Sequence, residues 1–338
     1  MKRIKADVLQ QTVEKIFLNE GVNYGDAKLL ANIITRSSID GYQSHGINRV
    51  PMMIDYIRRG IINLKGKMVE VNSGMFFKVF DANNGLGPVN AWNSTGEAIK
   101  IAKEKGMGLV ALKNNTHWQR AGTYGWKAVN EGMIFICWTN TIPNLPPYGS
   151  NKNLLGNNPF VIAIPAKENN LVLDMSLSQF SYGKIAGYAR LNKELPEFGG
   201  YDENGNLTKN ASVIREKGTH LPIGFWKGSA LSLMLDLLAA ILSGGKTTRE
   251  IGLEANDAGL SQVFVAIDPD NFGSEEFRNR LIKETLLQLQ LEYDPGKNGF
   301  HYPGSGSYLR RKENLAKGIP VEDEILQKIN ELVLDRNI

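Results

Sequence analysis

The sequence predicts a mixed α/β protein in which helices come first and helices and strands then mix. Three observations indicate this fold class. Apolar residues recur at helical spacing over the first sixty positions, and short apolar runs bounded by turn residues follow Gly60. No Gly-x-Gly-x-x-Gly motif joins a strand to a helix, so a standard Rossmann fold has no support.

The helical part is defined by periodicity and by stop signals. Apolar residues from Val8 to Phe17 fall on one helical face, and Gly21 supplies a stop. A second helix is expected at about 26–39, and a third from near Asn48 to Gly60.

The remainder alternates between strands and helices. Residues 68–71 and 75–80 flank the turn Asn72-Ser-Gly74, which predicts a strand–turn–strand unit. The polar, glycine-rich stretch 197–219 is expected to be a long loop. No Gly/Ser-rich or Pro-rich linker occurs, so any domains should pack together. Helices are expected at 89–104, 226–242, 274–289 and twice after Tyr308, and strands at 108–112, 134–139, 160–164, 171–174 and 263–267.

Composition excludes several classes of function. The 338 residues include 39 basic and 35 acidic ones, and the net charge of +4 is too small and dispersed for a nucleic-acid partner. It suits a small anionic ligand. The only cysteine, Cys137, lies in an apolar run, which excludes an internal disulfide and predicts a buried structural thiol. No metal-ligand spacing occurs, so no metal is expected.

No targeting or membrane segment is expected. The first residues carry charge without the apolar core of a signal peptide. The most apolar run, 230–242, contains Asp236 and is shorter than the ~20 residues that a membrane span needs. The expected location is therefore the cytoplasm.

Two of the four histidines stand among small polar residues and glycines. His45 is followed by Arg49, and His117 by Arg120. An imidazole can deliver a proton near neutral pH, and an arginine can hold a carboxylate with two parallel hydrogen bonds. Reduction of a 2-oxo acid needs both groups. The alternative is that each histidine caps an element and each arginine is solvated; His220 and His301 fit such structural or surface roles better.

An ordered series of motifs resembles the malate/L-lactate dehydrogenase family of the type without a standard Rossmann fold. The motifs are Ser44-His-Gly-Ile-Asn-Arg49, Gly156-Asn-Asn-Pro159 with the apolar strand after it, Asp174-Met-Ser176, Ser181-Tyr-Gly-Lys184 and Trp226-Lys-Gly228. The resemblance implies a homodimer with a helical domain built from the chain ends (1–70, joined by about 308–338). It implies that residues 71–307 form a cofactor- and substrate-binding domain with a mixed, largely antiparallel sheet.

The resemblance also implies roles for individual residues. His45 would be the proton donor, with Ser44 and Asp202 assisting, and Arg49, His117 and Arg120 would bind the substrate. The cofactor would be NAD, although Ser305 stands where family members usually carry an acidic residue, which leaves NADP open. The residues that would contact it are Asn170, Leu171, Val172, Leu173, Asp174, Met175, Ser176, Trp226, Lys227, Gly304, Ser305 and Gly306.

Other segments indicate a more specific substrate class. Residues 117–126, 136–140, 146–149 and 200–209 resemble the family members that reduce 2,3-diketo-L-gulonate to 3-dehydro-L-gulonate. Polar residues that could line a site for such a sugar acid are Asn115, Thr116, Gln119, Arg120 and Thr123. Two alternatives stay open: a reductase of another 2-oxo acid or of a cyclic imino acid, and a catalytically silent ligand-binding protein on the same scaffold.

Overall fold

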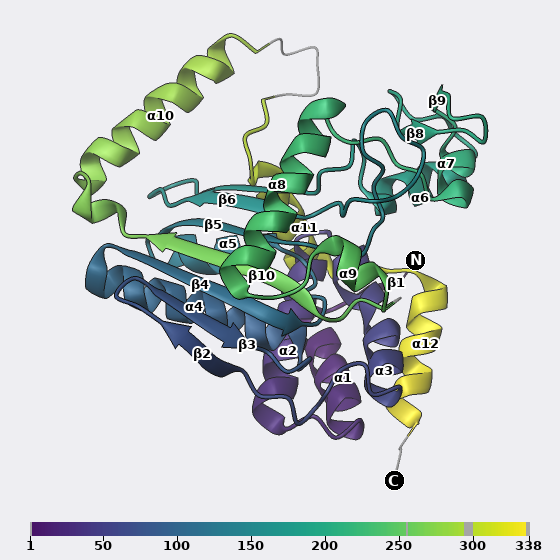
Figure 1. Ribbon diagram of the computed structural model, residues 1–338, viewed down its shortest axis with the longest axis horizontal. Coiled ribbons are helices and arrows are strands. Elements are labelled where there is room, and N and C mark those ends of the chain that lie inside the picture. The colour runs from purple at the N-terminus through teal and green to yellow at the C-terminus, as the bar shows by residue number, and fades with distance from the viewer. Residues whose placement is uncertain (1, 255, 294–299, 336–338) are drawn as a thin grey trace.

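A seven-stranded sheet forms the centre of the molecule, with helices on both faces and a helical body at one end (Figure 1). The computed structural model describes residues 2–254, 256–293 and 300–335. The strand order in the sheet is β2-β3-β4-β10-β5-β6-β7. These strands are β2 (Val69–Ser73), β3 (Phe77–Asp81), β4 (Met107–Asn115), β5 (Ile134–Thr139), β6 (Phe160–Ile164), β7 (Leu171–Met175) and β10 (Leu260–Ile267).

The sheet is mixed and largely antiparallel. Within it only β3 and β4 pair in parallel, whereas the other five neighbouring pairs are antiparallel. A Rossmann sheet is parallel because helical crossovers connect its strands. The predicted fold class is therefore confirmed.

Both faces of the central strands of the sheet are buried. Along β4, Val110 and Leu112 face one core, and Ala111 between them faces the other, as the period of two in a strand requires. Cys137 lies in the first core, fully buried as predicted. That core is covered by α4 (Gly87–Lys105) and α5 (Gly122–Asn130), and the opposite one by α8 (Trp226–Ser243).

Helix α8 is the most apolar helix of the described residues. Its 18 residues have a mean hydropathy of 1.3, which by length and composition is enough to cross a membrane. The apolar run expected at 230–242 is part of this longer helix, and the polar residue within it is informative. Asp236 is buried and accepts hydrogen bonds from Asn140 Nδ2 (2.9 Å) and from the Thr248 amide (2.8 Å), while Leu235 and Ala239 pack on the sheet. These are the contacts of a helix in a folded core.

The two chain ends form the helical body together. The strand β1 (Lys2–Ile4) pairs antiparallel with β11 (Ile319–Val321), and Ile329 near the C-terminus lies in the same core as Phe17 near the N-terminus. The helices are α1 (Ala6–Asn19), α2 (Tyr24–Ile39), α3 (Val50–Arg58) and α12 (Asp323–Leu334), with the short turns η1 (Gln43–His45) and η2 (Ile47–Arg49) before α3.

The expectation of a long loop at 197–219 was wrong. This stretch forms the small hairpin β8 (Gly200–Tyr201) and β9 (Leu207–Thr208) and the helix α7 (Ala211–Lys217). Together with α6 (Tyr182–Arg190) it encloses a core of its own around Ile185, Leu195 and Ile214. The polar sequence conceals this lobe because few side chains form its core.

Three further helices complete the chain. Helix α10 (Glu275–Leu291) projects from the sheet, and none of its residues is buried (Figure 1). Helix α11 (Ser305–Lys317) packs between the sheet edge and the helical body, since Tyr308 contacts Trp126 of α5 and Arg311 pairs with Asp40 beside α2. The short elements are α9 (Thr248–Gly252) and η3 (Pro269–Asn271).

Candidate active site

His45 lies in a tight turn where the helical body meets the sheet. Helix α2 ends at Ile39, and Gly41, with a φ of +87°, reverses the chain before the turn η1 that carries the histidine. The imidazole is partly buried, and its Nδ1 lies 3.0 Å from Ser44 Oγ. Ser44 thus fixes the orientation of the ring.

His117 approaches from the segment after β4. Its Nδ1 accepts a hydrogen bond from the Gln119 amide (3.0 Å), so the neutral ring carries its proton on Nε2. Gln119 has a φ of +66°, an unusual conformation for a residue with a side chain. The backbone therefore holds His117 with a donor free to face a ligand.

The two imidazole rings stack. Their centroids lie 5.9 Å apart and their planes differ by 24°. Burial lowers the pKa of His45 from 6.5 to about 4, helped by the charges of Arg49 and Arg120 and opposed by that of Asp174. Burial, with Arg49 and His45 adding to it, also lowers the pKa of His117 well below its usual value. The ligand-free pair is therefore neutral at pH 7.

Arg49 lies beside these rings, and its side chain is partly exposed. Its Nη2 donates to Asp257 Oδ2 (3.0 Å), and its side chain is 21% exposed. Arg49 lines a small cavity together with Tyr56, Thr116, His117 and Gln119. An anionic ligand entering here would meet one arginine and one neutral imidazole donor.

Arg120 does not occupy the environment expected of a substrate ligand. Its side chain is 4% exposed, and its nitrogens bond to Asp40, Asp174 and Ser307. Its guanidinium also lies over the Tyr42 ring, 3.8 Å from the centroid. The same sequence pattern, a histidine followed by an arginine, therefore gives one partly exposed arginine and one buried arginine.

Most of the polar residues expected to line the sugar-acid site already bond to other residues of the protein. Asn115 bonds to Asn90, Gln262 and Gly87, Thr116 bonds to the backbone of Gly85 and Gly87, and Thr123 lies 3.4 Å from Ser37. Gln119 differs, because its Oε1 is buried with no hydrogen-bond partner while its side chain lines the cavity beside His117. A ligand hydroxyl could satisfy this oxygen.

The expected cofactor segments meet at the sheet edge formed by β7. The Val172 amide donates to the Pro303 carbonyl (3.0 Å), which brings the turn before α11 against the strand. Gly304 has a φ of +98°, and a Cβ there would lie 3.2 Å from the Val172 nitrogen and 3.3 Å from the Trp126 ring. Only glycine fits this turn without strain.

The start of α8 lies beyond the end of the same strand. The Ile223 amide donates to the Leu177 carbonyl (2.8 Å), and Trp226 and Lys227 follow in the first turn of the helix. Helices α8 and α11 both begin without a side-chain cap. Uncapped helix N-termini are suited to anionic groups.

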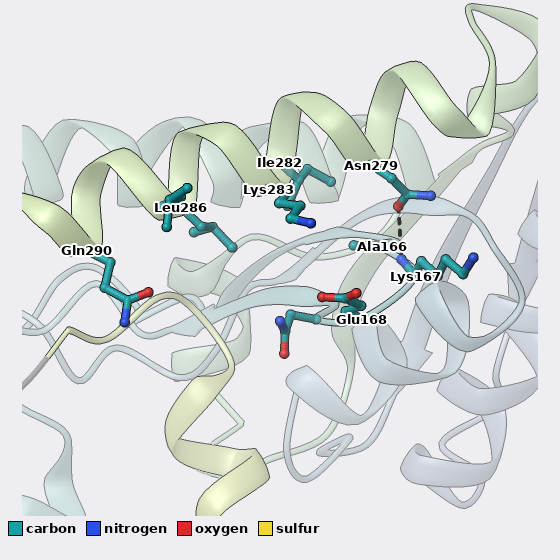
Figure 2. A pocket seen from close by; sticks show the side chains of 10 residues that line it. Ala166, Lys167, Glu168, Asn279, Ile282, Lys283, Leu286 and Gln290 are labelled. Carbon is teal, nitrogen blue, oxygen red and sulfur yellow. Dashed lines mark hydrogen bonds between the residues drawn. The ribbon is translucent and has the colours of Figure 1, made fainter.

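A cavity of about 240 Å³ lies at the other end of β7. The cavity is lined by α10 and by the loop 166–169, which directly precedes Asn170. Figure 2 shows Ile282 and Leu286 of α10 facing this loop, and the hydrogen bond from the Lys167 amide to Asn279 Oδ1 (2.9 Å) that ties the two together.

Asp202 takes part in its own turn. Its carboxylate accepts hydrogen bonds from the amides of Asn204 (2.9 Å) and Asn206 (2.8 Å), which lower its pKa. Among the described residues no contact joins it to His45. The lobe that carries it does reach the site through Gly183, where a Cβ would lie 3.6 Å from Ser44 Oγ.

Two acidic partners of these arginines, Asp257 and Asp40, were not among the predicted site residues. Asp257 is 208 positions from Arg49, and Asp40 is 80 positions from Arg120. No local spacing relates such residues, so folding alone brings them together. His220 is buried against the Tyr182 ring, and His301 is exposed.

Comparison with known proteins identifies the family. Residues 4–330 match the malate/L-lactate dehydrogenase family over nearly the whole chain. The chain belongs to this family. The chain is 36% identical over 332 residues to the 2,3-diketo-L-gulonate reductase of Citrobacter koseri, covering 98% of this chain and 100% of that protein.

Solved structures agree with the family assignment. Sulfolactate dehydrogenase from Methanocaldococcus jannaschii superposes with a TM-score of 0.90 at 29% identity, covering 98% of this chain and 96% of that one. The Δ1-piperideine-2-carboxylate reductase from Pseudomonas syringae has a TM-score of 0.87 at 28% identity, with 98% and 100% covered. This member of the malate/L-lactate dehydrogenase family is an oxidoreductase of an oxo acid that works with a nicotinamide cofactor.

Proposed function

We propose that this enzyme reduces the C2 carbonyl of a 2-oxo sugar acid, 2,3-diketo-L-gulonate, to give 3-dehydro-L-gulonate. The observation that carries the proposal is the stacked pair His45–His117, which has Arg49 on its border and the orphaned Gln119 oxygen beside His117. A diketo acid with hydroxyl groups offers a partner to each. The relatives of that name, 34–36% identical, support the same substrate.

Arg49 would hold the substrate carboxylate. Its side chain is partly exposed and pairs with a single carboxylate, Asp257, whereas the Arg120 side chain is enclosed. A substrate carboxylate would share or replace Asp257 on this guanidinium, as a charge-assisted hydrogen bond allows. The carboxylate would thereby bring the adjacent C2 carbonyl to the histidines.

His45 would donate the proton to the C2 oxygen. Ser44 Oγ at 3.0 Å can accept a hydrogen bond from Nδ1 when the ring is charged, which leaves Nε2 for the substrate. The negative charge of the substrate beside Arg49 would offset one cause of the lowered pKa of His45 and so favour its protonated form. His117, a neutral donor through Nε2, would bond the C3 oxygen.

The residues at β7 fit a nicotinamide dinucleotide. The glycine cradle at Gly304 and the uncapped starts of α8 and α11 suit a pyrophosphate that needs close backbone approach. We therefore assign Asn170–Ser176, Trp226, Lys227 and Gly304–Gly306 as its contacts. When bound, the reduced nicotinamide supplies a hydride to the carbonyl carbon.

NAD is the preferred form of the cofactor in this proposal. The arginine nearest to Gly306 is Arg310, which lies 3.4 Å from the Cβ position there. Its Nε donates to the Asp40 carbonyl (2.9 Å) and its Nη2 to Tyr42 Oη (3.4 Å). An arginine engaged in this way is less able to bind the 2′-phosphate of NADP.

A second copy of the chain is the proposed partner. Helix α8 packs Leu235 and Ala239 on the sheet and exposes a row of large apolar side chains, and an exposed apolar patch of this kind is typical of subunit interfaces. Its members, each 37–74% exposed, are Trp226, Leu231, Leu233, Met234, Leu237, Leu238, Ile241 and Leu242.

The test is the oxidation of NADH, followed by absorbance, with 2,3-diketo-L-gulonate, other 2-oxo acids and a cyclic imino acid. We expect the sugar acid to have the highest kcat/KM, and NADH to be preferred to NADPH. His45→Gln should lower kcat by about 10²–10⁴-fold, the usual contribution of a general acid. His301→Gln is the matched control, because this histidine is exposed and is not among the proposed contacts of substrate or cofactor.

The outcomes separate the alternatives. Faster turnover of a simple 2-oxo acid or of an imino acid would replace the proposed substrate but keep the chemistry. Cofactor binding without turnover of any compound would indicate a silent binding protein. Near-normal kcat in His45→Gln would overturn the role of this histidine.

A further inference from the structure

We propose that Arg120 is a positioning residue that fixes the His45 turn against the cofactor strand β7 and the start of α11, and that it does not bind substrate. This inference rests on the proposed function, because the reaction requires His45 to be held at a set distance from the cofactor. It is carried by the contacts of a single buried guanidinium.

Each contact of Arg120 reaches a different element. Nη1 donates to Asp40 Oδ2 (2.5 Å) at the end of α2, Nε donates to Asp174 Oδ2 (3.1 Å) in β7, and Nη2 donates to Ser307 Oγ (3.2 Å) in α11. Tyr42, which lies between Asp40 and His45 in the chain, stacks on the guanidinium plane. One side chain thus ties together the His45 turn and two of the expected cofactor segments.

The two carboxylates of this cluster are paired with arginines. Arg311 also pairs with Asp40, through Nε (2.7 Å) and Nη2 (3.0 Å), so two arginines face Asp40 and Asp174. Removing Arg120 would leave Asp40, which is 5% exposed, paired only with Arg311. It would also remove the arginine partner of Asp174, which is 15% exposed. Buried charges that lose a partner rearrange or take up protons.

The local sequence makes room for the cluster. A Cβ on Gly122 would lie 2.4 Å from Asp174 Oδ2, so the glycine two residues after Arg120 allows the carboxylate to approach. Lysine could not replace the arginine, because its three donors radiate from one atom, whereas the guanidinium fork points in three directions within one plane.

The experiment compares Arg120→Met and Arg120→Lys with the wild type. We expect kcat to fall on the order of 100-fold in both while KM for the oxo acid changes little, since misplacement of reacting groups lowers the rate. Arg311→Met is the matched control: it removes a partner of Asp40, and the hydrogen bonds of the Arg311 side chain reach neither the Asp174 carboxylate nor Ser307 Oγ.

A second readout follows the His45 imidazole by NMR. Its assignment is practical because the chain has four histidines. The groups that act on it are Arg49 of η2, Asp174 of β7, Arg120 and the neighbouring His117 ring. Loss of the Arg120 charge should raise the pKa of His45 in Arg120→Met, whereas Arg120→Lys and Arg311→Met should leave it nearer to the wild-type value.

The results discriminate between roles. Normal kcat with a raised KM in Arg120→Met would identify a substrate ligand and overturn the inference. Equal losses in Arg120→Met and Arg311→Met, with no change in the His45 titration, would reduce Arg120 to a stability residue and also overturn it. If the wild type reduced no oxo acid, the proposed function would fail, and the His45 titration would still decide the inference.

Discussion

Arg49 and Arg120 each follow a histidine by three or four positions, yet their surroundings differ in burial and charge. Arg49 has one carboxylate partner and an accessible side chain, whereas Arg120 is enclosed by two carboxylates, a hydroxyl and an aromatic ring. A guanidinium whose nitrogens all donate to protein groups has few N–H donors available for a ligand. At the scale of residues, the partner decides the role.

The lowered pKa of His45 predicts an asymmetric pH dependence. Reduction needs the protonated ring and oxidation the neutral one, and the free ring is neutral above its pKa of about 4. The kcat/KM for reduction should therefore fall as pH rises above this value, while the kcat/KM for oxidation rises to a plateau. Profiles of both directions, from about pH 4 to about pH 9, check this.

The profile of kcat should be displaced from that of kcat/KM. Substrate binding places a carboxylate near Arg49, whose charge is one cause of the lowered pKa, so the pKa seen in kcat should be the higher one. His45→Gln should abolish the dependence. A kcat/KM pKa at the ordinary value of 6.5 would contradict the argument.

At the scale of elements, periodic segments could be predicted and sparse ones could not. The helix expected at 89–104 is α4 (Gly87–Lys105), and the strand expected at 160–164 is β6. The hairpin β8–β9 was missed because its strands have two residues each. β1 and β11 were missed because each has three residues, and their partners are at opposite ends of the chain.

The turn at Gly304 provides a test of the cofactor segment. Gly304→Ala puts a Cβ against Val172 and Trp126 at a φ of +98°, so we expect weaker NADH binding, measured by fluorescence, and a lower Tm. Gly318→Ala is the control, because Gly318 ends the same helix with a φ of +86° and contacts Arg3 and Ile4 instead. It should lower Tm alone; weakened NADH binding in both variants would contradict the assignment.

At the scale of the whole molecule, the candidate active site forms where three parts meet. The helical body supplies His45 and Arg49, the segment after β4 supplies His117, and β7 supplies Asp174. Exposed apolar side chains lie elsewhere, on the outer face of α8, and α10, which projects from the sheet (Figure 1), adds further exposed leucines. This distribution supports an assembly of two chains.

Ile241→Glu tests the assembly. Ile241 is 74% exposed on α8, and a carboxylate at a subunit interface would lose its hydration. We expect the molar mass from light scattering to fall from two chains to one. Leu334→Glu, on the 81% exposed end of α12, should leave the mass unchanged. A wild-type mass of one chain would contradict the proposed dimer.

The sequence by itself determined the mixed α/β class, the long helices and strands, and the family, because periodicity and ordered motifs are local properties. It also indicated His45, His117 and Arg49. The tertiary structure alone decided that Arg120 is enclosed and that Asp257 faces Arg49, since these partners are 80 and 208 positions apart. Burial and charge depend on such distant contacts, and local patterns do not encode them.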